Sequence, residues 1–98
     1  MKRVTILGAT GSVGTSTLDL VEREPERFEV VALTANRDVA GLAAAAIRTN
    51  AQLAVVADEA FLPPLRAALA GTGIRAEGGA QAVCEAARMP TDWTMAAI

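Results

Sequence analysis

The chain of 98 residues contains no histidine, no tyrosine and a single cysteine, Cys84. Histidine is the commonest general base in enzymes, and tyrosine is a frequent proton donor. Because the chain has neither, these two residue types cannot carry proton-transfer chemistry here. A lone cysteine cannot form an internal disulfide, and without histidine a cysteine–histidine metal site lacks ligands. These absences indicate a reducing, cytoplasmic setting, and they predict that the chain does not itself perform proton transfers.

Neither sign of charge dominates, because the chain has 9 basic and 11 acidic residues. A protein that binds nucleic acid needs a basic surface, so nucleic acid is not an expected partner. No hydrophobic run approaches the roughly 18–20 residues of a membrane span, and glycines interrupt the apolar start that follows Lys2 and Arg3. We therefore expect one soluble domain without a signal peptide or membrane contact.

Short apolar, β-branched segments alternate with segments of helical periodicity. Such alternation predicts an α/β doubly wound parallel sheet, the Rossmann-like NAD(P)-binding fold, with strand order 3-2-1-4-5 and a ligand crevice at the carboxyl ends of strands 1 and 4. The expected strands cover residues 3–7, 28–34, 53–56, 74–77 and 94–98. The expected helices begin at Ser12, run from Asp38 to Asn50, cover 65–70 (where Pro63 and Pro64 also permit a turn), and carry Ala80, Val83, Cys84 and Ala87.

Several side chains receive structural predictions from this arrangement. Ser12 and Asp38 are placed to cap helices, because a short side-chain oxygen accepts from free N–H groups at a helix start. Cys84 falls on the apolar face of its helix, which predicts a small buried thiol rather than a nucleophile. Trp93 is expected to pack against the sheet where the last strand begins. Because residue 98 falls inside that fifth strand, we expect the chain to be the N-terminal part of a longer protein.

A glycine-rich turn joins the first strand to the first helix. Glycine allows a positive φ and lets a phosphate approach the backbone, while the helix dipole and free N–H groups supply positive potential. This position and spacing predict a site for a dinucleotide pyrophosphate, with a purely structural glycine turn as the alternative. The candidate cofactor-binding residues of the turn are Gly8, Thr10, Gly11, Ser12, Val13 and Gly14.

The end of the second strand indicates which dinucleotide would bind. An NAD site usually places an acidic residue there to accept from the ribose 2′-hydroxyl, whereas an NADP site places an arginine near the 2′-phosphate. The strand ends without an acid and is followed by Arg37, whose guanidinium can bind a phosphate through two nitrogens. Arg37 therefore favours NADP over NAD, although Asp38 leaves NAD open and a solvated Arg37 is the alternative.

Three pieces of this sequence together resemble one enzyme family. They are Gly8-Ala9-Thr10-Gly11-Ser12-Val13-Gly14, Ser16-Thr17-Leu18-Asp19 and Met95-Ala96-Ala97-Ile98. Along all 98 residues the chain is similar to the N-terminal NADPH-binding domain of the 1-deoxy-D-xylulose 5-phosphate reductoisomerases. That family converts 1-deoxy-D-xylulose 5-phosphate to 2-C-methyl-D-erythritol 4-phosphate in non-mevalonate isoprenoid biosynthesis, using NADPH and a divalent metal, Mg or Mn.

The resemblance also implies roles for single residues. Thr10, Gly11, Ser12 and Val13 would hold the pyrophosphate. Ala35, Asn36 and Arg37 would surround the 2′-phosphate, and Ala97 and Ile98 would lie at the nicotinamide side. Many family members have Gly-Lys-Asn at positions 36–38, so this chain keeps the positive charge but lacks the glycine and adds Asp38.

The resemblance also implies that several functional groups of the enzyme lie outside these 98 residues. The catalytic, metal-binding and sugar-phosphate-binding residues would follow Ile98, so no catalytic residue and no metal ligand is assigned within the chain. We expect these 98 residues to be inactive alone and the full-length enzyme to be a homodimer. Two alternatives stay open: the NADP-binding domain of another oxidoreductase, such as a semialdehyde dehydrogenase, or a nucleotide-sensing module without catalysis.

Overall fold

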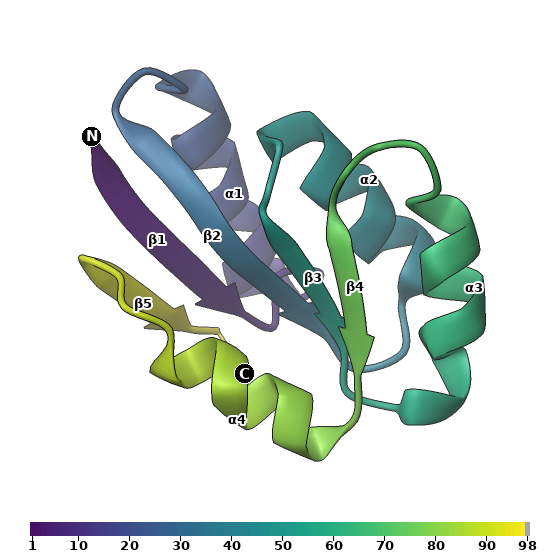
Figure 1. Cartoon of the computed structure of the whole chain (residues 1–98). Helices are drawn as coiled ribbons and strands as arrows, with labels where there is room; N and C mark the ends of the chain where they lie inside the picture. The colour runs from purple at the N-terminus through teal and green to yellow at the C-terminus, as the bar shows by residue number, and fades with distance from the viewer. Residues whose placement is uncertain (98) are drawn as a thin grey trace.

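Strands and helices alternate along the computed structural model, which describes residues 1–97 (Figure 1). The strands predicted at 3–7, 28–34, 53–56 and 74–77 are confirmed to within one residue at each end. The third helix, predicted over 65–70, instead covers Leu62–Ala68, so it both starts and ends earlier than predicted. It follows a 3₁₀ turn and carries Pro63 and Pro64 in its first turn, where proline is well tolerated. The elements are β1 (Lys2–Leu7), α1 (Ser12–Arg23), β2 (Phe28–Ala35), α2 (Val39–Thr49), β3 (Leu53–Val56), η1 (Glu59–Phe61), α3 (Leu62–Ala68), β4 (Arg75–Gly78), α4 (Ala80–Arg88) and β5 (Trp93–Ala96).

The five strands form one parallel sheet in the order β4-β3-β2-β1-β5. The doubly wound parallel class is confirmed, but the predicted order 3-2-1-4-5 is wrong. Three successive crossovers carry the chain outward from β1 to β4, and the chain then returns to pair β5 with β1. The charged residues Arg75 and Glu77 suit β4 to the sheet edge, where charge discourages pairing with other chains. The winding therefore reverses between β1 and β5, rather than between strands 1 and 4.

Helices cover the two faces of the sheet unequally. The larger core joins one face to α1, α2 and α3 through Leu18, Val21, Leu42 and Leu65. On the opposite face α4 packs Ala86 over β2 and β3, and Figure 1 shows it across the sheet from α1 and α2. None of the helices within residues 1–97 combines the length and the hydropathy of a membrane-spanning segment.

The side chains that α4 turns to the sheet differ from those predicted. Cys84 is exposed, so the expectation of a buried thiol is wrong. The helix instead packs through Ala82, Val83, Ala86 and Met89. This rotation covers the larger side chains Val83 and Met89, and burial of such side chains contributes more than burial of a thiol or a methyl group. Trp93, by contrast, packs as predicted, with its ring centroid 6.5 Å from that of Phe28.

Thr5 on β1 provides a first testable prediction about stability. Its side chain is 0% exposed, and Oγ1 has no hydrogen-bond partner within residues 1–97. A buried hydroxyl without a partner is unfavourable, whereas a valine of the same branched shape has no such requirement. We expect Thr5→Val to raise the free energy of unfolding by about 1 kcal/mol, measured by urea denaturation. A lower stability of this variant would show that the hydroxyl is satisfied in solution.

Candidate functional site

The glycine turn is attached to the end of the neighbouring strand β2. Gly8 has φ of 81°, in the left-handed region that favours glycine. Its N–H donates to Thr34 Oγ1 at 2.9 Å, and the N–H of Ala9 donates to the Thr34 carbonyl at 2.7 Å. These bonds bring the start of the turn beside the segment that follows β2. The glycine turn, predicted to bind the pyrophosphate, therefore lies beside the end of β2, predicted to discriminate NADP from NAD. Both lie at the carboxyl ends of the strands.

The Thr34 hydroxyl that accepts from Gly8 provides a second prediction. Thr34 is 3% exposed, so Thr34→Val would leave the Gly8 N–H without this acceptor in a mostly dry environment. Such a loss typically costs about 1–3 kcal/mol. We expect a drop of this size in the free energy of unfolding, measured under the conditions used for Thr5→Val. The same chemical change is thus expected to have opposite effects at the two threonines, and a stability of Thr34→Val equal to or above that of the unsubstituted protein would contradict the role of its hydroxyl.

The N-terminus of α1 lies at this end of the sheet and lacks a side-chain cap among the described residues. The residue before the helix is Gly11. The predicted capping role of Ser12 is therefore wrong, because Ser12 is already the first helical residue. Gly11, Ser12 and Val13 are all exposed, and the large apolar residue Val13 is 56% exposed. An anion at this position would satisfy the free N–H groups and interact favourably with the helix dipole.

Two glycines of the turn have different surroundings. A Cβ built at Gly14 would overlap the Gly8 carbonyl oxygen and lie 2.7 Å from Ala9 Cα, so only glycine fits there. A Cβ at Gly11 would meet nothing in the described chain closer than the Gly8 carbonyl oxygen, 3.8 Å away. Gly14 thus lets α1 pack closely against the turn, whereas the described chain leaves room for a Cβ at Gly11.

Ala35, Asn36 and Arg37 follow the end of β2 at the same edge. Ala35 is buried, while Asn36 and Arg37 are exposed. The Arg37 Nε lies 3.1 Å from Asp58 Oδ2 in the segment after β3. Asp38 caps α2 as predicted, because its Oδ1 accepts from the Gly41 N–H at 2.9 Å. Arg37 is therefore a cation at this end of the sheet that is paired through Nε, and one oxygen of Asp38 is used to cap α2.

The chain returns to the turn after β5. The N–H of Ala97 donates to the Leu7 carbonyl at 2.8 Å, and the Ala97 carbonyl oxygen would lie 4.0 Å from a Cβ at Gly11. Ala97 thus lies beside the glycine turn at the point where the winding reverses, the usual ligand position in open parallel sheets. Ile98, the other residue assigned to the nicotinamide side, lies outside the described residues.

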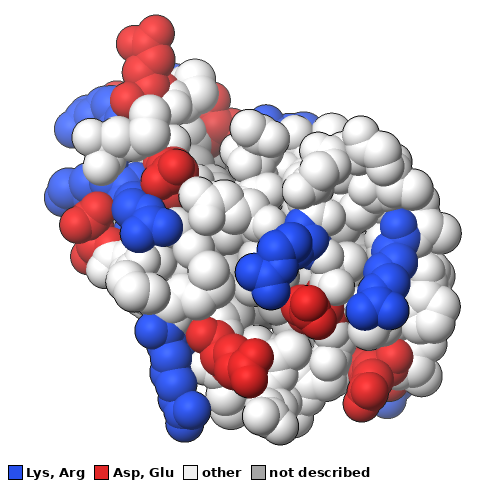
Figure 2. Space-filling view, viewed as in Figure 1, with Lys and Arg blue, Asp and Glu red and all other residues white. Residues whose placement is uncertain are grey.

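Charged side chains of both signs occur at this end of the sheet, where Arg37 pairs with Asp58. Figure 2 shows acidic and basic side chains interspersed on the visible face. Within residues 1–97, no three aspartate, glutamate, cysteine or histidine side chains come together as a metal site would require. The described residues therefore do not fit a metal ion.

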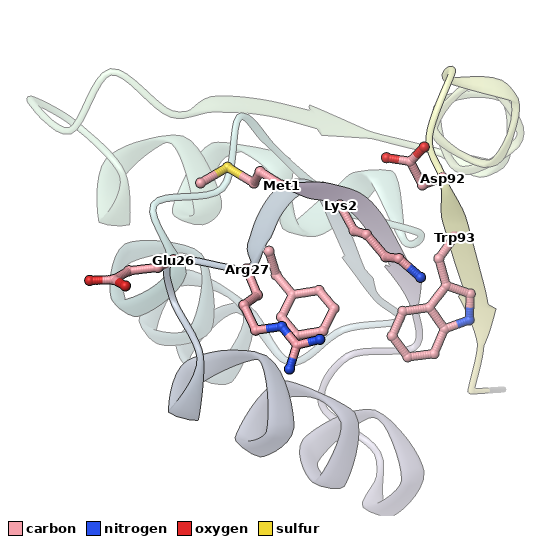
Figure 3. A pocket seen from close by; sticks show the side chains of 7 residues that line it. Met1, Lys2, Glu26, Arg27, Asp92 and Trp93 are labelled. Carbon is pink, nitrogen blue, oxygen red and sulfur yellow. The ribbon is translucent and has the colours of Figure 1, made fainter.

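A cavity of about 610 Å³ lies at the opposite end of the sheet (Figure 3). It is formed where β1, β2 and β5 begin, so it is remote from the glycine turn at the carboxyl ends. Figure 3 shows Trp93 and Lys2 at one side of it and Glu26 at the other. Its lining residues are Met1, Lys2, Glu26, Arg27, Phe28, Asp92 and Trp93.

Known proteins with similar sequences share one description. The family model described as 1-deoxy-D-xylulose 5-phosphate reductoisomerase matches residues 4–98. The reductoisomerase of Rhodopseudomonas palustris (strain BisA53) is 59% identical over 98 residues, which cover 100% of this chain and 24% of that protein. The reductoisomerase of Zymomonas mobilis is 59% identical over 97 residues, which cover 99% of this chain and 25% of that protein. The chain thus spans about a quarter of the length of these curated relatives.

Solved structures agree with the sequence relatives. The reductoisomerase from Zymomonas mobilis in complex with NADPH superposes with a TM-score of 0.98 at 59% identity, over 99% of this chain and 26% of that one. A reductoisomerase in complex with NADPH, fosmidomycin and magnesium superposes with a TM-score of 0.92 at 30% identity, over 100% of this chain and 24% of that one. The chain therefore belongs to the 1-deoxy-D-xylulose 5-phosphate reductoisomerase family.

Proposed function

We propose that residues 1–98 are the NADPH-binding part of an enzyme that converts 1-deoxy-D-xylulose 5-phosphate to 2-C-methyl-D-erythritol 4-phosphate. The observation that carries the proposal is the uncapped N-terminus of α1 above a glycine turn, in a chain that closely matches a structure described as an NADPH complex. When bound, NADPH supplies the hydride for the reduction. The residues of this chain bind and orient it.

The glycine turn would hold the pyrophosphate. The N–H groups of Ser12 and Val13 in the uncapped first turn of α1 would supply donors, whereas the Gly11 N–H already donates to the Gly8 carbonyl at 3.4 Å. The hydroxyls of Thr10 and Ser12 can add two more donors. The space above Gly11 lets a phosphate approach the backbone, while Gly8 and Gly14 maintain the shape of the turn. Ala97, beside Gly11, would border the nicotinamide side, and Ile98 is proposed for that side on the family resemblance.

The choice of NADPH over NADH would rest on Arg37, with Ala35 and Asn36 forming the surrounding backbone. A 2′-phosphate is bound by a guanidinium, whereas a 2′-hydroxyl is bound by a free carboxylate. The Asp38 carboxylate caps α2 by accepting from the Gly41 N–H, so it is less available to accept from a ribose 2′-hydroxyl. This argues against NAD, the alternative cofactor that the sequence left open. This arrangement supports a site for the phosphorylated dinucleotide.

Substitution of Arg37 tests the cofactor assignment. We expect Arg37→Ala to lower NADPH affinity about tenfold and to leave NADH affinity unchanged, because only NADPH carries the 2′-phosphate that the charged hydrogen bonds would recognise. The measurement is a fluorescence titration of the purified protein with each dinucleotide. Arg37→Lys is the matched control and should retain part of the preference. Equal affinity of the unsubstituted protein for NADPH and NADH would refute the assignment.

The complete reaction needs groups that residues 1–97 do not bring together, above all a metal site. We propose that the divalent metal, Mg or Mn, and the sugar phosphate are bound by residues outside this chain in a cytoplasmic homodimer. Sequencing the source reading frame beyond codon 98 tests this. A continuation rich in acidic residues, whose product oxidises NADPH only with the sugar phosphate and metal, is expected. A stop codon after Ile98 would favour the nucleotide-sensing module instead, while the family match gives no support to a semialdehyde dehydrogenase.

A further inference from the structure

Arg37 is not a free surface cation, because it is paired with a carboxylate from the next strand. Its Nε lies 3.1 Å from Asp58 Oδ2, and the side chains are 69% and 30% exposed. The two residues are 21 positions apart in the sequence, and they meet because β2 and β3 are adjacent parallel strands that end together. Asp58, which follows β3, thus lies next to the proposed dinucleotide site although it is outside the glycine turn.

Asp58 itself is held by several bonds. Its Oδ1 accepts from the Ala60 N–H at 3.1 Å, which caps the 3₁₀ turn η1, and its own N–H donates to the Asn36 carbonyl at 3.0 Å. The N–H of Ala57 also donates to the Ala35 carbonyl at 2.8 Å. The carboxylate is therefore a fixed point, whereas the Arg37 side chain is long and mostly exposed. Contact with the fixed partner restricts where the guanidinium lies.

The atom that Asp58 contacts leaves the rest of the guanidinium available. Arginine carries five N–H donors, and the contact through Nε leaves the two terminal nitrogens for a second acceptor. A phosphate is well bound by such a pair of nitrogens. The Asp58 carboxylate also adds negative charge near the phosphate, but the paired arginine offsets that charge. Restricting the guanidinium reduces the entropy lost when the phosphate binds.

We infer that Asp58 is a positioning residue that orients Arg37 toward the 2′-phosphate and thereby increases the preference of the site for NADPH over NADH. The inference rests on the proposed function, because it requires that Arg37 binds the 2′-phosphate. Asp58 itself need not touch the dinucleotide.

The substitution Asp58→Ser separates the two roles of this side chain. A serine oxygen can still accept from the Ala60 N–H and cap the turn, but it is too short to reach Arg37. Because the Arg37 side chain of this ion pair is mostly exposed to solvent, the expected effect is modest: NADPH affinity should fall about threefold and NADH affinity should not change. Asp58→Asn keeps the length without the charge and should give a smaller loss. Thermal denaturation identifies any variant that has lost its fold.

A double-mutant cycle distinguishes positioning from a general structural role. In the Arg37→Ala background, Asp58→Ser should have no further effect on NADPH affinity, since the residue it orients is gone. A loss that persists in this background, or that is equal for NADH, would overturn the inference, as would unchanged or tighter NADPH binding by Asp58→Ser and Asp58→Asn. If Arg37→Ala alone leaves the NADPH preference intact, the cofactor assignment itself fails, which is a separate result.

Discussion

Gly14→Ala is expected to destabilise the protein by about 2 kcal/mol or more, although alanine is the better helix former. In a helix interior the change from glycine to alanine alone would stabilise by about 1 kcal/mol. Here the new Cβ would overlap the Gly8 carbonyl oxygen and lie 2.7 Å and 2.8 Å from Ala9 Cα and the Ala9 carbonyl carbon. These are backbone atoms, so the contact is relieved only by moving α1 away from the turn, and overpacking of this kind costs about 3 kcal/mol.

Urea denaturation of Gly14→Ala against the unsubstituted protein measures this effect. Gly11→Ala is the matched control, since it adds the same methyl group three residues earlier, where nothing in the described chain is closer than 3.8 Å. A glycine-to-alanine change at the position before a helix costs only about 1 kcal/mol or less. If Gly14→Ala were as stable as the unsubstituted protein, α1 would not pack as closely on the turn as the structure indicates.

Gly11→Ala in turn is expected to lower affinity for both NADPH and NADH at least about tenfold, which corresponds to about 1.4 kcal/mol. The φ of Gly11 is −77°, which alanine adopts without strain, so the fold should persist. The added methyl group would occupy the space through which the pyrophosphate approaches the free N–H groups of α1. Because the pyrophosphate is common to both dinucleotides, both affinities should fall together.

The pattern across variants makes this prediction specific. Gly11→Ala should reduce NADPH and NADH binding equally with little change in melting temperature, whereas Arg37→Ala should reduce NADPH binding alone. Fluorescence titration with each dinucleotide, combined with thermal denaturation, measures both quantities on the same samples. Full affinity of Gly11→Ala for NADPH would show that the phosphate does not lie over the turn.

Local signals in the sequence predicted the parts of the site that depend on neighbouring residues. The glycine turn between β1 and α1 follows from spacing and from the change in hydrophobic periodicity. The cap at Asp38 follows from its position just before the apolar face of α2. Each depends on interactions within a few residues, which a single sequence displays directly.

Features that depend on distant parts of the chain were not predictable in the same way. The strand order depends on which side of the sheet β4 and β5 join. The only local signal was the pair of charges on β4, Arg75 and Glu77, which are typical of an edge strand. The exposure of Cys84 depends on how α4 rotates against β2 and β3, because alanines occur on several sides of the helix and do not define one apolar face. The pairing of Arg37 with Asp58 required β2 and β3 to be neighbours with a known register.

The pairing of β5 with β1 also bears on the order in which the chain can assemble. The other three strand pairs join segments that follow one another along the chain, whereas the contact between Arg3 and Asp92 spans 89 residues. Closing a longer loop costs more conformational entropy and slows folding. Ala97 reaches Gly11 only through this pairing. The proposed dinucleotide site is thus completed by the pairing of β5 with β1, which has the largest cost in loop-closure entropy of the four strand pairs. A dinucleotide bound at this site would stabilise that pairing.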